Sequence, residues 1–77
     1  NDYQLSYYPN PVKDIFYLSY DVEIVSISVM NTLGQLVLSQ NIGSNNAQID
    51  MSTLPSGNYF VNVESSEVMR TVKVIKL

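Results

Sequence analysis

Polar and apolar residues alternate along most of this 77-residue chain, and no long stretch keeps the period of a helix. A period of two is typical of β-strands, because successive side chains of a strand point to opposite faces of the sheet. Turn-forming residues interrupt the alternation about every 8–12 residues. The pattern therefore predicts seven strands, over residues 3–7, 16–20, 25–31, 35–40, 47–51, 59–63 and 68–76.

Turn-forming residues mark the ends of the first predicted strands. Pro9 and Pro11 cannot donate a hydrogen bond to a neighbouring strand, so the segment that they form with Asn10 is expected to end the first strand. A polar turn is predicted at 21–23 and a loop at 43–46, where Gly, Ser and two Asn follow one another.

Two later turns contain glycines that the backbone is expected to need. Gly34 ends a tight turn over 32–34 and is expected to adopt the positive φ that other residues resist. Leu54, Gly57 and Tyr59 have the spacing of a tyrosine corner, in which the ring packs in the core and the hydroxyl bonds back to the preceding backbone. Together these signals predict an all-β, immunoglobulin-like antiparallel β-sandwich formed by a single domain over 1–77.

The alternation also predicts which side chains share a face. Val12 is expected to pack as the chain enters the second strand, and the apolar faces of later strands contain Val25, Ile27 and Val29; Leu36 and Leu38; Val72 and Val74. The chain has no Cys and no His, so neither disulfides nor a zinc site can stabilise it. All stabilisation must come from packed apolar side chains, which make up 45% of the residues.

The residue types needed for most catalysis are missing. Without His and Cys there is no ordinary general base near neutral pH and no thiolate nucleophile. Asp14, Asp21 and Glu23 leave carboxylate chemistry or calcium binding formally open, but such acids are expected to solvate loops and protect strand edges. The net charge of −3 disfavours nucleic-acid binding. We predict no enzyme activity, no small-molecule substrate, no cofactor and no metal site.

The chain contains six tyrosines, which could in principle stack on sugars. Most of them stand in predicted strands, so packing against neighbouring strands or in the core is expected instead. Tyr8 and Tyr17 are the pair expected to be most exposed. This pair keeps open an alternative function, an accessory module that binds carbohydrate or mediates adhesion.

Four segments together resemble a known family, the C-terminal sorting domains of the type IX secretion system. The segments are Tyr8-Pro9-Asn10-Pro11-Val12 followed by Asp14, then Asn31-Thr32-Leu33-Gly34-Gln35-Leu36-Val37, then Leu54-Pro55-Ser56-Gly57-Asn58-Tyr59, and finally Thr71-Val72-Lys73-Val74-Ile75-Lys76-Leu77. The resemblance covers nearly the whole chain. Two small departures are Met30, where the family often has an aromatic residue, and Leu77, which follows the final Lys.

The resemblance implies a role in protein export. Proteins with such a domain cross the inner membrane by an N-terminal signal peptide, and the outer-membrane translocon then recognises the C-terminal domain. A sortase-like cysteine transpeptidase commonly removes the domain at the linker before it, here around or upstream of Asn1. The chain is then expected to be part of a larger exported protein that reaches the cell surface or the medium, with Leu77 at or near the natural C-terminus.

The motif residues are expected to differ in role. Those in turns should fix the fold, namely Pro9, Asn10, Pro11, Asn31, Gly34, Gln35, Leu54, Gly57 and Tyr59. Those of the last strand are candidates for recognition by the translocon, namely Lys73, Val74, Ile75, Lys76 and Leu77. A basic strand could dock by strand addition or by charge, although lysines at an edge also simply prevent aggregation. Dimers formed through edge strands, or a spacer role with further domains after Leu77, remain alternatives.

Overall fold

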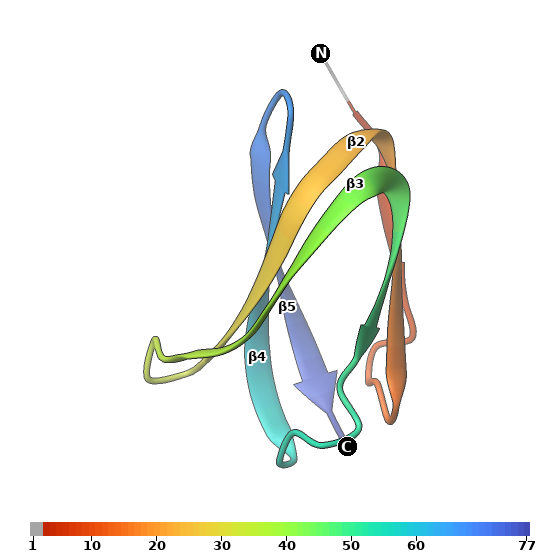
Figure 1. The fold of residues 1–77 in the computed structure, drawn as a ribbon. Coiled ribbons are helices and arrows are strands. Elements are labelled where there is room, and N and C mark those ends of the chain that lie inside the picture. Colours follow the sequence, from red (N-terminus) through yellow and green to blue (C-terminus); the bar gives the residue numbers. More distant parts are fainter. Residues whose placement is uncertain (1–2) are drawn as a thin grey trace.

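The computed structural model describes residues 3–77, which form five strands of one antiparallel sheet (Figure 1). The strands are β1 (Leu5–Tyr8), β2 (Ile15–Asn31), β3 (Leu36–Asp50), β4 (Gly57–Ser65) and β5 (Met69–Lys76). β2 pairs with β1, β3 and β4, and β5 pairs with β4. The predicted all-β class is confirmed. Among the described residues, no helix is long and apolar enough to cross a membrane.

The prediction of seven strands is wrong because β2 and β3 each join two of the predicted strands. The turn expected at 21–23 lies within β2, and the loop expected at 43–46 lies within β3. Ser19 pairs with Asn46 and Ile24 with Ser44, so residues 20–23 of β2 lie opposite the single residue 45 of β3. Such bulges bend a strand without ending it. The polar residues of the two strands lie opposite each other, so they bend both strands of the β2–β3 hairpin at the same point instead of dividing it into four strands.

The bend curls the sheet over its own core. β1 pairs with residues 17–20 of β2, before the bend, whereas β4 pairs with residues 24–31, after it. Figure 1 shows β2 and β3 passing together over the top of the molecule, with β1 along one arm and β4 and β5 along the other. The separate two-sheet, immunoglobulin-like arrangement is not confirmed, since all five strands belong to one continuous sheet.

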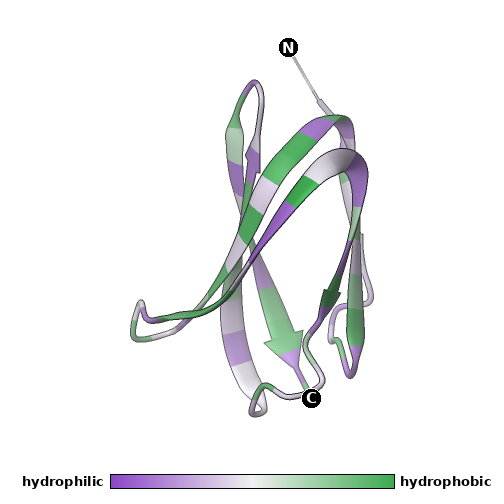
Figure 2. Cartoon of the chain, in the orientation of Figure 1, coloured by the Kyte–Doolittle hydropathy of each residue, from purple (hydrophilic) through white to green (hydrophobic). Residues whose placement is uncertain are grey.

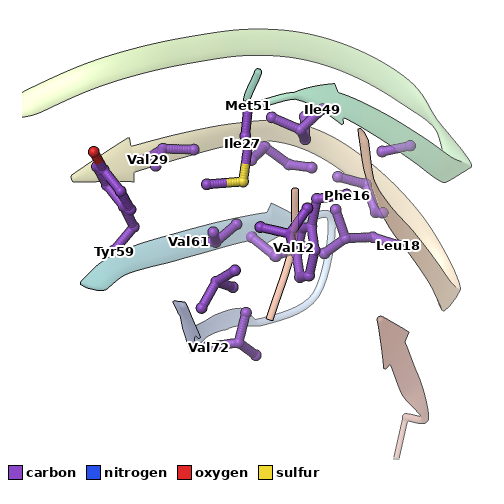
Figure 3. Packing of buried hydrophobic residues seen from close by; sticks show 14 of the residues in the cluster. Val12, Phe16, Leu18, Ile27, Val29, Ile49, Met51, Tyr59, Val61 and Val72 are labelled. Atoms are coloured by element: carbon purple, nitrogen blue, oxygen red, sulfur yellow. The ribbon is translucent and has the colours of Figure 1, made fainter. Parts of the chain in front are cut away.

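The core fills the space between the two arms. Figure 2 shows the expected alternation of apolar and polar residues along the strands, and Figure 3 shows the apolar side chains converging from separate parts of the chain. The buried apolar residues are Val12, Phe16, Leu18, Tyr20, Ile24, Ile27, Val29, Ala47, Ile49, Met51, Tyr59, Val61, Val63, Val72 and Val74. The predicted burial of Val12, Val72 and Val74 is confirmed.

Two residues of the predicted apolar faces lie outside the core. Val25 is 44% exposed and Leu36 is 61% exposed. The register between β2 and β3 shifts beside both of them, between Ile24 and Ser26 and between Val29 and Met30. Because a shift of one residue moves side chains to the other face of a sheet, Ile24 is buried in place of Val25.

Candidate functional site

The side chain of Asn10 bonds to the outer edge of β5 as a neighbouring strand would. Its Nδ2 donates a hydrogen bond to the carbonyl oxygen of Lys73 over 3.0 Å, and its Oδ1 accepts one from the N–H of Ile75, also over 3.0 Å. The two bonds join residues more than 60 positions apart in the sequence. A single side-chain amide thus satisfies one acceptor and one donor of the strand edge.

The backbone of Val12 continues this contact toward the end of the chain. Its N–H donates to the carbonyl of Ile75 over 2.8 Å, and its carbonyl accepts from the N–H of Leu77 over 2.9 Å. Val12 also forms a parallel bridge with Lys76, and its side chain is fully buried. The Pro9–Val12 segment therefore covers the outer edge of β5 from Lys73 to Leu77.

The first and last sequence motifs meet at this edge. Strand periodicity predicted that the prolines end the first strand, but it carries no information about which distant segment they contact. A side chain that bonds to the backbone of another strand leaves no periodic signal either. The role of Asn10 was therefore visible in the sequence only as a motif residue, and the part played by the Val12 backbone was missed.

The five candidate recognition residues, the last four of β5 and Leu77, divide into two groups. Val74 is buried and Lys76 is only 7% exposed, with its Nζ donating to the carbonyl oxygen of Leu77 over 2.8 Å. Lys73, Ile75 and Leu77 alternate with them and are exposed. Phe60 of β4 pairs with Lys73 and is also exposed.

We call the exposed side chains of Phe60, Lys73, Ile75 and Leu77 the terminal face. The terminal face combines three apolar side chains with one cation. Val74 and Lys76, in contrast, attach the strand to the body of the molecule. A partner that docks on the folded domain can therefore reach Lys73, Ile75 and Leu77, but it cannot reach the side chain of Val74.

The tyrosine corner supports β5 from the opposite edge. The hydroxyl of Tyr59 donates to the carbonyl oxygen of Pro55 over 2.7 Å, its ring is buried, and Leu54 packs against the core, as the sequence predicted. Tyr59 pairs with Val74, and Gly57 pairs with Lys76. The third motif therefore holds the inner edge of the same segment that Asn10 and Val12 cover on the outside.

The second motif forms a turn of its own between β2 and β3. The Oδ1 of Asn31 accepts hydrogen bonds from the N–H groups of Leu33 and Gln35, each over 3.0 Å, and its Nδ2 donates to Oε1 of Gln35 over 2.9 Å. Gly34 has the expected positive φ, 81°. This turn projects from the end of the hairpin, away from the C-terminus (Figure 1). Asn31 and Gln35 therefore shape the hairpin and do not contribute to the terminal face.

The tyrosines form local pairs. Tyr8 is 60% exposed, as predicted, but Tyr17, which was expected to be exposed with it, is half-buried. The two rings stack with centroids 5.2 Å apart, so each covers part of the other. Tyr7 packs against Phe16, and Tyr3 against Tyr20. One face of the Tyr17 ring is therefore covered by Tyr8 and is not available to stack on a sugar.

The acidic side chains are arranged locally. Within residues 3–77, no three of them gather in a way that could hold a metal ion. Asp21 accepts a hydrogen bond from the N–H of Gln4 over 2.9 Å. Hydrogen bonds from the side chain and the backbone of Ser52 hold the pKa of Asp50, the last residue of β3, below its usual value. These acids order turns and strand ends.

The comparisons with known proteins concern the family of this chain. No significant match to a curated protein was found. A family model described as "Secretion system C-terminal sorting domain" matches residues 6–77, which include all four motifs and every residue of the terminal face. The chain therefore belongs to the family of C-terminal sorting domains of the type IX secretion system.

Proposed function

We propose that this domain is the sorting signal of an exported protein, and that the outer-membrane translocon recognises it on the terminal face. The family match supports a sorting role in type IX secretion. The more specific proposal, recognition on the terminal face, rests on the covered edge of β5. The hydrogen bonds from Asn10 and Val12 hold residues 73–77 in one fixed conformation. A fixed segment loses little conformational entropy on binding.

Recognition by side chains fits this edge better than strand addition at the terminal residues. The carbonyl of Lys73, both polar groups of Ile75 and the N–H of Leu77 already have partners within the domain. A strand added there would first have to displace Asn10 and Val12. The exposed side chains of Lys73, Ile75 and Leu77 need no such displacement, and they offer apolar area beside a positive charge. We propose that the translocon presents a complementary apolar and acidic surface.

In this proposal the domain is bound and delivered, and it performs no reaction. Removal by a cysteine transpeptidase after export, and the appearance of the cargo at the cell surface or in the medium, belong to the same proposal. The expected cleavage linker around Asn1 lies outside the described residues. The alternative function in sugar binding gains no support, since the exposed Tyr8 is paired with Tyr17 and does not form part of a wider aromatic strip.

A reporter fusion tests the proposed function. The whole segment is fused to the C-terminus of a periplasmic reporter, in a host that has the secretion system, and reporter is measured in the periplasm, at the surface and in the medium. We expect export with the intact segment and periplasmic retention when 73–77 are deleted or the translocon is inactivated. Retention of the reporter despite the intact, folded domain would contradict the proposal.

A further inference from the structure

The outer edge of β5 is covered over only part of its length. In an antiparallel strand, both polar groups of every second residue point to the same side. Ile75 directs its N–H and carbonyl outward to Asn10 and Val12, so Lys73, Thr71 and Met69 also direct theirs outward. The Lys73 carbonyl is taken by Asn10. No strand of residues 3–77 pairs with β5 on this side, which leaves Lys73 N–H and the polar groups of Thr71 and Met69 free.

We propose that a second copy of this chain pairs with this free edge, antiparallel, about a two-fold axis at Thr71. In this arrangement the Thr71 residues of the two copies exchange both of their backbone hydrogen bonds. The Lys73 N–H of each copy donates to the Met69 carbonyl of the other. These four bonds use every free backbone group of Thr71 and Lys73 in both copies, together with the carbonyl of Met69. Only the N–H of Met69 stays without a partner in the dimer. The free edge is self-complementary, as a two-fold symmetric interface requires.

The ends of the free edge and the charge of Arg70 together favour this register. Moving the axis toward Lys73 would require the polar groups of Ile75, which Asn10 and Val12 already occupy. Moving it to Met69 would bring in residue 67, which lies in the turn closed by the bond from Ser65 N–H to the Val68 carbonyl. An axis at Arg70 would also form four bonds, between Thr71 and Met69, but it would place the exposed, like-charged Arg70 side chains of the two copies directly opposite each other. The cap by Asn10 therefore limits the interface to residues 69–73.

The other long edge strand is less suited to pairing. The free edge of β3 is interrupted by the bend and by the register shifts near Val25 and Met30, and bulges of this kind oppose strand addition. β5 pairs with β4 over its whole length without a shift. Because only a few residues of each copy meet, we expect a weak dimer whose population depends on concentration.

Charge substitutions test the register. In the proposed dimer, exposed Met69 lies directly opposite Lys73 of the second copy, whereas within one copy these two residues are four positions apart on one strand. Met69→Lys places two like charges opposite each other, at two symmetric positions, and should weaken association roughly 2- to 30-fold. Within the monomer the new lysine lies opposite Glu64, so folding should not suffer.

A second substitution should restore association. In Met69→Lys/Lys73→Glu, each lysine at 69 faces a glutamate of the other copy, so the double variant should regain at least the association of the original chain. Sedimentation velocity over a range of concentrations measures all three proteins, and circular dichroism confirms that each is folded. An original chain that stays monomeric at millimolar concentration, or a dimer equally strong in all three proteins, would overturn the proposal.

Cysteine cross-linking provides a test that does not depend on charge. The chain has no Cys, so Thr71→Cys introduces a single thiol at the proposed axis. Hydrogen-bonded residues of antiparallel strands have Cα atoms about 5.5 Å apart, within the range of a disulfide. Mild oxidation should cross-link Thr71→Cys in proportion to the dimer present, and the matched control Thr53→Cys, in an exposed loop, should cross-link far less. Equal cross-linking at both positions would overturn the proposal.

Discussion

Asn10 shows at the scale of one residue what an amide between two prolines contributes to this fold. The prolines can donate no backbone hydrogen bonds, so the segment needs another group to bond to β5. The side chain of Asn10 supplies a donor and an acceptor, and both are used. Aspartate has the same size but only accepts, and the hydroxyl of threonine would have to make both bonds from a single atom.

Asn10→Asp tests this requirement. The substitution keeps the acceptor for the Ile75 N–H but removes the donor to Lys73, and it places a carboxylate beside a carbonyl oxygen. We expect the free energy of unfolding to fall by about 1–3 kcal/mol, measured by urea denaturation. Asn58→Asp, at an exposed position where no side-chain hydrogen bond is formed, is the matched control and should change it much less. Equal effects of the two substitutions would contradict the role of Asn10.

Glycine is required at position 57 because of the backbone conformation there, and not because a side chain would lack space. Its φ is +151°, and a Cβ atom added there would meet no other atom within 4 Å. Gly57→Val should therefore cost about 1–3 kcal/mol of unfolding free energy through backbone strain, without any steric clash. Ser56→Val, its exposed neighbour, serves as control in the same thermal melts. If Gly57→Val melted at the temperature of the original chain, the corner would not need glycine.

At the scale of the elements, the long hairpin of β2 and β3 shows what the sequence could and could not predict. The alternation correctly placed Phe16, Leu18 and Ile49 in strands, and the turn residues correctly predicted the turn at 32–34. The turn expected from Leu54 ends earlier than predicted, because β4 already begins at Gly57. Local sequence does not distinguish residues that end a strand from residues that bend it, because the same polar residues and glycines do both. The outcome at 21–23 and 43–46 depends on their lying opposite each other in the hairpin.

The turn at the end of this hairpin depends on one side chain. Asn31→Ala removes three hydrogen bonds that close the turn between β2 and β3. Since the turn is exposed and water can replace part of these bonds, we expect a loss of about 1–2 kcal/mol of unfolding free energy. Thr32→Ala, also exposed, should cost less in the same urea titration. Because the turn lies away from the terminal face, a folded Asn31→Ala variant should still be exported.

At the scale of the whole molecule, the first and third motifs both act on the fourth, at the end of β5. Asn10 and Val12 cover the outer edge of β5 near its end, and the tyrosine corner holds the inner edge. The order of the motifs along the chain was readable from the sequence, and it identified the family. Their convergence was not, because it depends on the curl of the sheet. The result is a terminal segment that is fixed in position and exposed on one side.

The most direct measurement compares two apolar side chains that are equally exposed but lie in different places. Ile75 of the terminal face is 43% exposed, and Val25 at the bend of β2 is 44% exposed. Ile75→Ser and Val25→Ser should both fold, as checked by thermal melts, and each is fused to the same periplasmic reporter. We predict that the Ile75 variant is retained in the periplasm and that the Val25 variant is exported. Normal export of a folded Ile75→Ser variant would contradict recognition at the terminal face.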